Sequence, residues 1–323
     1  MGHFLSCDWG TSSFRLRLIE AETLDILAEQ RSEQGIASTF SLWQGINQLD
    51  ALARETFYLN YVQEHVIQLE DQLSIGLKGI PAIFSGMASS SIGLKELPYG
   101  TLPFSTDGRD IPVVLLEPIE EFSHPAYLIS GIKSEDDVMR GEETQLVGVV
   151  FQLGDMNGEQ LFIFPGTHSK HISVKNRQVT HFKTYMTGEF FDLLSNKSIL
   201  SASVQKHQND IHWPSFDRGL EMALSSNLLH ASFMVRAQHL FGLSTKEQNH
   251  DLLSGLLIGT ELKELLQRPA AQIYLCCNSQ LKPRYESALA QLRLKPARVF
   301  LGEEIDQAVI RGQMIIYKQM KNR

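Results

Sequence analysis

The sequence predicts an α/β fold built in two halves, and two observations support this. Short apolar runs with the period of strands alternate along the chain with longer segments that have the period of helices. A pattern of strand, short Gly-Thr turn and strand also occurs twice, at 4–19 and at 161–174. With 323 residues, 43% of them hydrophobic and 20% charged, the chain is long enough for two domains with ordinary cores.

The first repeat joins the apolar run 4–7 to the alternating segment 14–19 through Gly10-Thr11-Ser12-Ser13. Alternation of this kind is typical of a half-buried strand, so the segment is predicted to be a β-hairpin. The second repeat has the same order, with 161–164 and 171–174 on either side of Gly166-Thr167-His168-Ser169. Both turns are expected to expose backbone N–H groups.

The remaining elements follow from the same two periods. We expect helices at 49–69, 142–151, 189–194, 217–229, 252–266 and 284–292, and further strands at 82–84, 113–116, 127–129 and 273–276. The polar stretch Lys133-Ser134-Glu135-Asp136-Asp137 is the strongest boundary signal and predicts domains at 1–135 and 136–323. Gly255 and Gly259 lie four residues apart in an apolar helical segment and predict close helix packing.

Charge and cysteine content exclude several classes of protein. The 29 Lys and Arg against 37 Asp and Glu give a net charge of -8, and no basic block of the kind that binds nucleic acid occurs. A small anionic ligand is compatible with this charge, because a closed site needs only a few local donors. The three cysteines include the adjacent pair Cys276 and Cys277, which argues against a disulfide framework and favours a reducing compartment, so we expect a cytoplasmic protein.

Membrane attachment is not expected. The longest apolar stretch, around 252–262, is far shorter than a membrane span. The first six residues match a loose myristoylation pattern, but Phe4 and Leu5 in that segment are better explained as the start of the first strand.

Both Gly-Thr turns have the composition of a phosphate-binding loop. Glycine allows close approach of the backbone, hydroxyl groups add donors, and successive N–H groups form a concave anion site. Each turn alone is better explained as an ordinary hairpin turn, and the presence of one copy in each half is what favours phosphate binding. Asp8 beside the first turn either binds Mg²⁺ or caps the turn, and Arg15 either reaches a phosphate or is a solvated strand residue.

The segment Asp8-Trp9-Gly10-Thr11-Ser12-Ser13-Phe14-Arg15 resembles the first phosphate motif of the actin, heat-shock ATPase and sugar kinase superfamily. Four further segments, at 138–146, 165–170, 187–189 and 253–259, resemble the 2-dehydro-3-deoxygalactonokinases. The nine residues at 138–146 are the most specific of them. Together these segments cover essentially the whole chain.

This resemblance implies two ribonuclease-H-like (actin-like ATPase) domains that flank a nucleotide cleft. It also implies transfer of the γ-phosphoryl group of ATP, with Mg²⁺, to the 6-hydroxyl of 2-dehydro-3-deoxy-D-galactonate in galactonate catabolism. A small sugar acid is then the expected partner, and a homodimer is compatible with the sequence.

The resemblance further implies roles for individual residues. Glu142 is similar in place to a catalytic base in the wider kinase branch, where a Gly-Asp-Gln stretch stands instead of Gly141-Glu142-Glu143. A carboxylate within hydrogen-bond reach accepts the proton of the attacking hydroxyl, and the change of residue leaves the choice between Glu142 and Glu143 open. The nucleotide and its metal are expected at Asp8, Gly10, Thr11, Ser12, Arg15, Gly166, Thr167, Asn278 and Ser279, with Asp8 as the metal ligand, and the sugar acid at Gly86, Met87, Ser89 and Arg140.

Two departures from the superfamily pattern and three alternatives accompany this interpretation. Pro165 stands where distant members have an acid, and Cys276-Cys277 stands where relatives have a glycine-rich adenine turn. Adjacent cysteines lack the spacing of zinc ligands. The alternatives are a non-catalytic sugar-acid sensor on the same fold, a phosphohydrolase, and a kinase for the epimer 2-dehydro-3-deoxygluconate.

Overall fold

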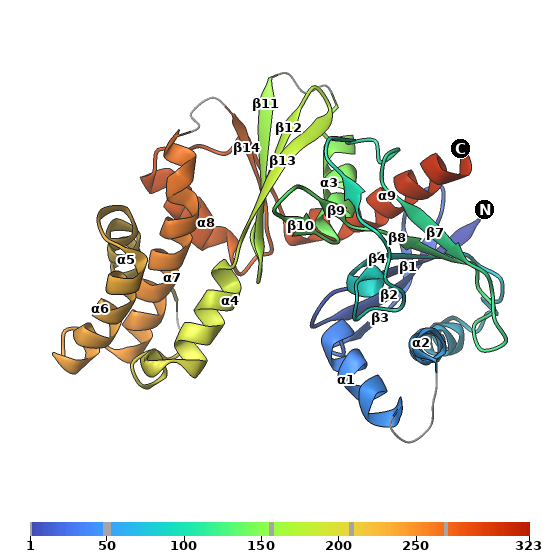
Figure 1. Ribbon diagram of the computed structural model, residues 1–323, viewed down its shortest axis with the longest axis horizontal. Coiled ribbons are helices and arrows are strands. Elements are labelled where there is room, and N and C mark those ends of the chain that lie inside the picture. Colours follow the sequence, from blue (N-terminus) through green and yellow to red (C-terminus); the bar gives the residue numbers. More distant parts are fainter. Residues whose placement is uncertain (1, 48–52, 155–157, 207–209, 268–270) are drawn as a thin grey trace. The chain divides into compact units, whose positions relative to one another are not determined.

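The computed structural model describes residues 2–47, 53–154, 158–206, 210–267 and 271–323. The chain forms two compact units (Figure 1). The first contains Met1–Met156, Lys175–His181 and Glu303–Arg323, and the second contains Asn157–Val174 and Phe182–Gly302. Each unit is made of segments that are separate along the chain. The division into domains at 1–135 and 136–323 stays a prediction.

The first unit is built on a mixed sheet with the strand order β3-β2-β1-β4-β8-β7. The first three strands in the chain are antiparallel neighbours, β4 and β8 continue the sheet parallel to β1, and β7 is antiparallel to β8. The strands are β1 (His3–Trp9), β2 (Phe14–Glu20), β3 (Ile26–Ser32), β4 (Ala82–Gly86), β7 (Val113–Leu116) and β8 (Ala126–Ile129).

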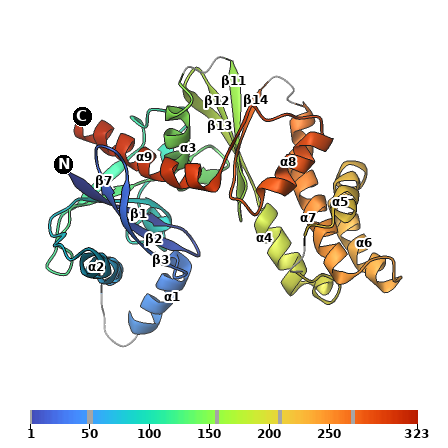
Figure 2. The same ribbon diagram turned by 180° about the vertical axis from the view of Figure 1, so that it is seen from behind.

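The alternation along β1 divides this sheet into two faces. Leu5, Cys7 and Trp9 are fully buried in the core that includes α2 (Arg54–Leu73), and α1 (Ile36–Asn47) precedes that helix. On the other face lies α9 (Gly302–Lys321), whose Gln313 side chain donates to the Cys7 carbonyl at 3.0 Å. Figure 2 shows α9 and α2 on opposite sides of the strands.

Helix α3 (Glu142–Phe151) packs closely against α9 through two glycines. A Cβ atom on Gly148 would lie 1.9 Å from the Ala308 carbonyl oxygen, and one on Gly312 would lie 1.9 Å from the Thr144 carbonyl oxygen. The unit also contains a small sheet ordered β10-β9-β5 and the short turn η1 (Met87–Ser89). Its strands are β5 (Gly100–Thr101), β9 (Ile132–Lys133) and β10 (Val138–Met139).

The second unit repeats the strand order of the first. Its sheet runs β15-β14-β11-β12-β13, and the first residues of β13, which belong to the first unit, pair with β6 (Phe104–Ser105). The strands are β11 (Glu159–Phe164), β12 (Ser169–Lys175), β13 (Gln178–Tyr185), β14 (Gln272–Cys276) and β15 (Arg298–Phe300). In the first unit β1 lies between β2 and β4, and in the second unit β11 lies between β12 and β14. Strand β4 is parallel to β1, and β14 is parallel to β11. This repeated order is the ribonuclease-H-like topology, so the expected α/β class and both hairpins are confirmed.

Helices α5 (Trp213–Ser225), α7 (Lys246–Leu262) and α8 (Lys282–Gln291) share a core with β11 and β14 on one face of the second sheet. Helices α4 (Thr187–Asp192) and α6 (Leu228–Leu240) pack against α7. The short helical segments are η2 (Leu193–Lys197), η3 (Ile199–Ala202) and η4 (Lys263–Gln267). A Cβ atom on Gly255 of α7 would lie 2.0 Å from the Phe216 carbonyl oxygen of α5, and one on Gly259 would lie 2.7 Å from Leu220. The predicted close packing at these two glycines is confirmed.

Some expected elements differ from the structure. The single helix expected at 217–229 is wrong, because α5 ends at Ser225 and the Asn227 side chain accepts from the Leu229 amide to cap a new helix, α6. The helix expected at 49–69 begins at Arg54, and the part of that prediction at 49–52 lies outside the described residues. Helices α1 and α9 and strands β3, β5, β6, β9, β10, β13 and β15 were not predicted from the sequence. No helix in the described part of the chain is long and apolar enough to cross a membrane.

Candidate functional site

Three segments of the first unit meet where the parallel strands β1 and β4 end. Asp8 pairs with Ser85 across these strands, and a Cβ atom on Gly86 would lie 3.6 Å from the Asp8 Oδ1 atom. A Cβ atom on Gly141, which has a φ of 106°, would lie 3.3 Å from the Gly86 Cα atom. We call Asp8, Gly86 and residues 141–143 the strand-end site. The carboxyl ends of parallel strands are a common position for ligands in α/β proteins.

Hydrogen bonds from the start of α1 hold the turn 10–13, here called the first tip. The amides of Ile36 and Ala37 donate to the carbonyl oxygens of Gly10 and Thr11 at 3.0 and 3.1 Å. A Cβ atom on Gly35 would lie 2.3 Å from the Thr11 carbonyl oxygen, so only glycine permits this approach. The side chains of Thr11 and Ser12 are exposed at the tip.

Basic side chains surround Asp8 on the face toward α9. Burial raises the pKa of the Asp8 carboxyl above its ordinary value, and the guanidinium groups of Arg15 and Arg17 oppose this shift. The Arg15 Nη1 atom lies 2.5 Å from the Asp306 Oδ1 atom of α9. Arg15 is therefore already paired with a carboxylate, in addition to any role at a phosphate.

Glu142 and Glu143 begin α3 but occupy different environments. Glu143 is 1% exposed, both of its carboxylate oxygens accept from the Gly141 amide at 2.8 and 2.9 Å, and the Thr144 hydroxyl donates to one of them. Burial and the charge of Glu142 raise the pKa of Glu143 to about 7. Glu142 is only half-buried and accepts from the Arg140 amide at 3.2 Å. Its carboxylate is thus the more accessible of the two.

Arg140 connects the strand-end site to the loop that follows β4. Its Nη1 atom donates to the buried Ser89 hydroxyl at 2.6 Å, its Nη2 atom donates to the Leu97 carbonyl at 3.3 Å, and its guanidinium lies 4.0 Å from the centre of the Tyr99 ring. Met87 in this loop is half-buried. Three of the four residues expected at the sugar acid therefore lie in close contacts of this site. Arg140 donates to Ser89, and Gly86 lies against Gly141.

The turn 166–169, here called the second tip, is held as the first tip is. The Glu189 amide at the start of α4 donates to the Thr167 carbonyl at 3.0 Å, and a Cβ atom on Gly188 would lie 2.6 Å from the Gly166 carbonyl oxygen. The exposed His168 side chain lies 2.5 Å from a Glu189 carboxylate oxygen. The Gly166 amide donates to the Ser169 hydroxyl at 3.3 Å.

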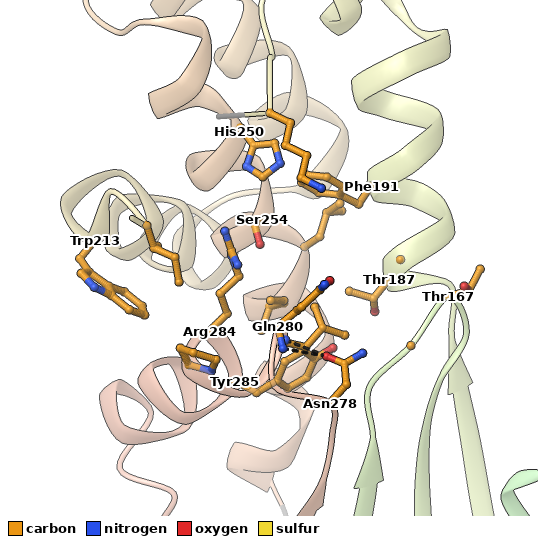
Figure 3. A pocket seen from close by; sticks show the side chains of 18 of the residues that line it. Thr167, Thr187, Phe191, Trp213, His250, Ser254, Asn278, Gln280, Arg284 and Tyr285 are labelled. Carbon is orange, nitrogen blue, oxygen red and sulfur yellow. Dashed lines mark hydrogen bonds between the residues drawn. The ribbon is translucent and has the colours of Figure 1, made fainter. Parts of the chain in front are cut away.

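A pocket of about 1180 Å³ adjoins the second tip within the second unit (Figure 3). Gly166 and Thr167 line it together with Thr187 and Gly188, and Figure 3 shows Trp213 on the opposite side from Thr167. The pocket connects a polar tip to an aromatic end, which suits an elongated ligand with an anionic end and a flat ring.

Of the residues expected at the adenine, Asn278 lines this pocket, and Ser279 is exposed beside it. The Asn278 side chain accepts from the amides of Gln280 and Leu281 at 3.1 and 2.9 Å and so fixes the turn after β14. Cys276 and Cys277 are buried, and burial raises the pKa of the Cys277 thiol to about 12. The Cys277 thiol therefore packs in the core and stays protonated.

Asp8 is the candidate ligand for Mg²⁺ in the first unit. In the described residues, no group of three or more His, Cys, Asp or Glu side chains is arranged to hold a metal. Mg²⁺ bound to a nucleotide needs only one or two carboxylates, because phosphate oxygens and water complete its coordination. Asp8 fits this requirement, since Gly86 leaves space beside its carboxylate.

Comparison with known proteins relates the whole chain to one family. Residues 8–316 match the family model described as 2-keto-3-deoxy-galactonokinase. The Escherichia coli K12 protein named 2-dehydro-3-deoxygalactonokinase is 31% identical over 318 residues, which is 96% of each chain. A Rhizobium meliloti protein named probable 2-dehydro-3-deoxygalactonokinase is 31% identical over 329 residues, which is 96% of this chain and 95% of its own.

The chain belongs to the 2-keto-3-deoxy-galactonokinase family. The crystal structure of a Sinorhizobium meliloti protein, described as a putative 2-dehydro-3-deoxygalactonokinase, is 28% identical, covers 98% of this chain and 99% of its own, and superimposes with a TM-score of 0.76. This member of the family therefore shares the fold of a protein solved under that assignment.

In this member of the 2-keto-3-deoxy-galactonokinase family, sequence reasoning missed several pocket residues. Arg284 of α8 lines the pocket and donates from Nη2 to the fully buried Asp251 at 3.0 Å. Trp213, His250 and Gln280 also line it. These residues come from α5, α7, α8 and the turn before α8, and no local motif indicates that they share one cavity.

Proposed function

We propose that this chain transfers the γ-phosphoryl group of ATP to the 6-hydroxyl of 2-dehydro-3-deoxy-D-galactonate, as a cytoplasmic step of galactonate catabolism. The observation that carries this proposal is the strand-end site in a chain that belongs to a kinase family. There an accessible carboxylate, Glu142, starts a helix whose preceding Gly141 lies against Gly86, beside Asp8.

In this proposal each tip offers its backbone N–H groups to phosphate, and the pocket at the second tip takes the nucleoside part of ATP. Glu142 accepts the proton of the acceptor hydroxyl as that oxygen attacks phosphorus. Asp8 would hold Mg²⁺, which offsets the charge on the phosphate oxygens when bound. Glu143 fixes the turn at Gly141 through its two hydrogen bonds to that amide.

On the acceptor side, the loop after β4 binds the sugar acid. Arg140 holds this loop through Ser89 and the Leu97 carbonyl, so it orients Gly86 and Met87 as well as offering its charge to the substrate carboxylate. Orientation of this kind contributes to rate because the hydroxyl must meet the phosphorus atom in line.

The decisive experiment measures ATP consumption and sugar phosphate formation with a panel of 3-deoxy aldonic acids. We expect turnover with 2-dehydro-3-deoxy-D-galactonate to exceed turnover with its gluconate epimer. Release of phosphate without any acceptor would instead indicate a phosphohydrolase. Binding of the sugar acid without ATP consumption would indicate a sensor.

The Glu142→Gln variant tests the catalytic base. We expect kcat to fall by roughly 10² or more while ATP binding persists, because the amide cannot accept the proton. Steady-state kinetics and ATP titration together measure both effects. The Glu143→Gln variant is the matched comparison, and a larger loss of kcat in Glu143→Gln than in Glu142→Gln would transfer the role to Glu143.

A further inference from the structure

Behind the second tip, a buried hydrogen-bond network surrounds Glu261 of α7. Its members come from four elements, β12, α4, α7 and α8, and are Ser169, His171, Thr187, Glu261 and Tyr285. Glu261, Tyr285 and His171 are 2%, 2% and 4% exposed, and Ser169 is fully buried. None of these side chains has a role in the chemical steps proposed above.

Glu261 accepts hydrogen bonds at both carboxylate oxygens. Its Oε1 atom lies 2.9 Å from the His171 Nε2 atom. Its Oε2 atom accepts from the Tyr285 hydroxyl at 2.8 Å and from the Thr187 hydroxyl. A buried carboxylate is costly unless it is paired and hydrogen-bonded, and here three side chains from three other elements meet that requirement.

One branch of the network reaches the second tip through Tyr285. Burial raises the pKa of the Tyr285 hydroxyl well above its ordinary value, so this group stays protonated and donates its hydrogen to Glu261. It therefore accepts from the Ser169 hydroxyl at 3.1 Å, and the Ser169 oxygen in turn accepts from the Gly166 amide. The position of the Gly166 backbone is thus linked to Glu261 by three consecutive hydrogen bonds.

The other branch reaches the same tip through Thr187. Gly188, the next residue, packs against the second tip. A Cβ atom on Gly188 would lie 2.6 Å from the Gly166 carbonyl oxygen and 2.8 Å from the Thr167 Cα atom. The Glu189 amide donates to the Thr167 carbonyl. One carboxylate therefore holds both the strand side and the helix side of the second tip, and both Thr187 and Tyr285 line the pocket beside it.

We infer that Glu261 is a positioning residue that fixes the second tip in the conformation that binds the phosphates of the nucleotide. This inference rests on the proposed function, because it takes ATP as the ligand of the pocket. Its consequence is specific to phosphate: loss of the network weakens ligands that carry phosphates and leaves the nucleoside part unaffected.

The Tyr285→Phe variant tests this inference by removing the hydroxyl that links Glu261 to Ser169. Calorimetric titration with ADP, and with adenosine by competition, gives the ratio of the two dissociation constants. We expect ADP to bind about 5- to 20-fold more weakly than to the unmodified protein, with adenosine changed less than about twofold. The Tyr274→Phe variant is the matched control, because it removes one hydroxyl of β14 that bonds only Gln272 among the described contacts.

Substitution of Glu261 itself tests the same inference independently. Glu261→Gln retains an oxygen that accepts from Tyr285 and Thr187, so its ADP-to-adenosine ratio should stay within about threefold of the unmodified protein. Glu261→Leu retains no acceptor, and its ratio should change at least as much as in Tyr285→Phe. In kinetics, KM for ATP should rise while KM for the sugar acid stays constant.

Equal weakening of ADP and adenosine in Tyr285→Phe would overturn the inference, because it would indicate general damage to the pocket. An unchanged ADP affinity in Tyr285→Phe would overturn it as well. Failure of the unmodified protein to bind either ligand would instead contradict the proposed function.

Discussion

Glu142 and Glu143 are adjacent and chemically identical, yet their surroundings give them different properties. Glu143 folds back onto the Gly141 amide and is buried, whereas Glu142 is half-buried. A helix advances 100° per residue, so neighbouring side chains at its start point in different directions. The environment therefore ties the Glu143 carboxylate to the turn at Gly141 and leaves Glu142, the proposed base, the more accessible of the two.

The raised pKa of Glu143 predicts a pH dependence of stability. This pKa is about 7 in the folded protein and near its ordinary value of 4.5 in the unfolded chain. The stabilisation that the protonated form provides is complete below pH 4.5 and is lost as the pH rises through about 7. Glu143→Gln removes this pH-dependent loss, because the amide does not ionise. The free energy of unfolding of the variant minus that of the unmodified protein should therefore increase by up to about 3 kcal/mol as the pH rises from 4.5 to 7.5.

Urea unfolding at a series of pH values measures this difference. The Glu135→Gln variant, at an exposed position, controls for the removal of one negative charge. A difference between Glu143→Gln and the unmodified protein that stays constant across this pH range would contradict the prediction.

At the scale of elements, both hairpins are supported by the same device. In each repeat a glycine at the start of the helix that follows the third strand, either just before it or in its first turn, lies against the tip, and the helix donates a backbone amide to a tip carbonyl. The glycine is Gly35 in the first unit and Gly188 in the second. The atoms it approaches belong to the backbone and cannot rotate away as a side chain could, so a methyl group at either position would displace the tip.

Gly35→Ala should therefore destabilise the first unit and distort the first tip. We expect a loss of more than about 2 kcal/mol, since the new Cβ atom would lie 2.3 to 2.5 Å from three backbone atoms of Thr11 and Ser12. Gly45 in α1 provides the matched control, because a Cβ atom there meets nothing within 4 Å. Gly45→Ala should instead stabilise by about 0.5 to 1 kcal/mol through helix propensity. Thermal unfolding measures both, and equal melting temperatures for the two variants would refute this interpretation of Gly35.

At the scale of the whole molecule, the chain leaves the first unit and returns to it with α9. The fully buried Gln313 of α9 donates to the Cys7 carbonyl of β1 and to the Ser85 hydroxyl of β4 at 3.0 and 2.8 Å. Strands from the first 90 residues thus depend on a helix from the last 25. The first unit is complete only when the whole chain is present.

A chain ended after Leu301 should lose the structure of the first unit selectively. Hydrogen exchange should show loss of amide protection in β1 and β4, because their partner helix is missing, and retained protection in β11 and α7 of the second unit. Equal protection of β1 in the full-length and shortened chains would show that α9 is dispensable for the first sheet.

Local pattern was sufficient for the parts of the fold that depend on local sequence. The two hairpins, α3 at 142–151, β7 at 113–116 and the packing of Gly255 and Gly259 were predicted from periodicity, turn composition and residue size. Helix α9 was missed although acidic residues begin it and lysines end it. Short motifs also indicated the family, because a segment such as 138–146 can be read in the sequence without knowledge of the tertiary structure.

Tertiary structure alone decided which of these residues meet. Glu261 and His171 are 90 residues apart, Arg284 and Asp251 are 33 apart, and Gln313 is more than 200 residues from both of its acceptors. Such contacts arise when elements pack, and a buried acid or amide is stable only where packing brings it donors and acceptors. The sequence by itself determined the class, the repeat and the family of this protein. Packing determined which acid is buried, which is accessible, and which carboxylate supports the second tip.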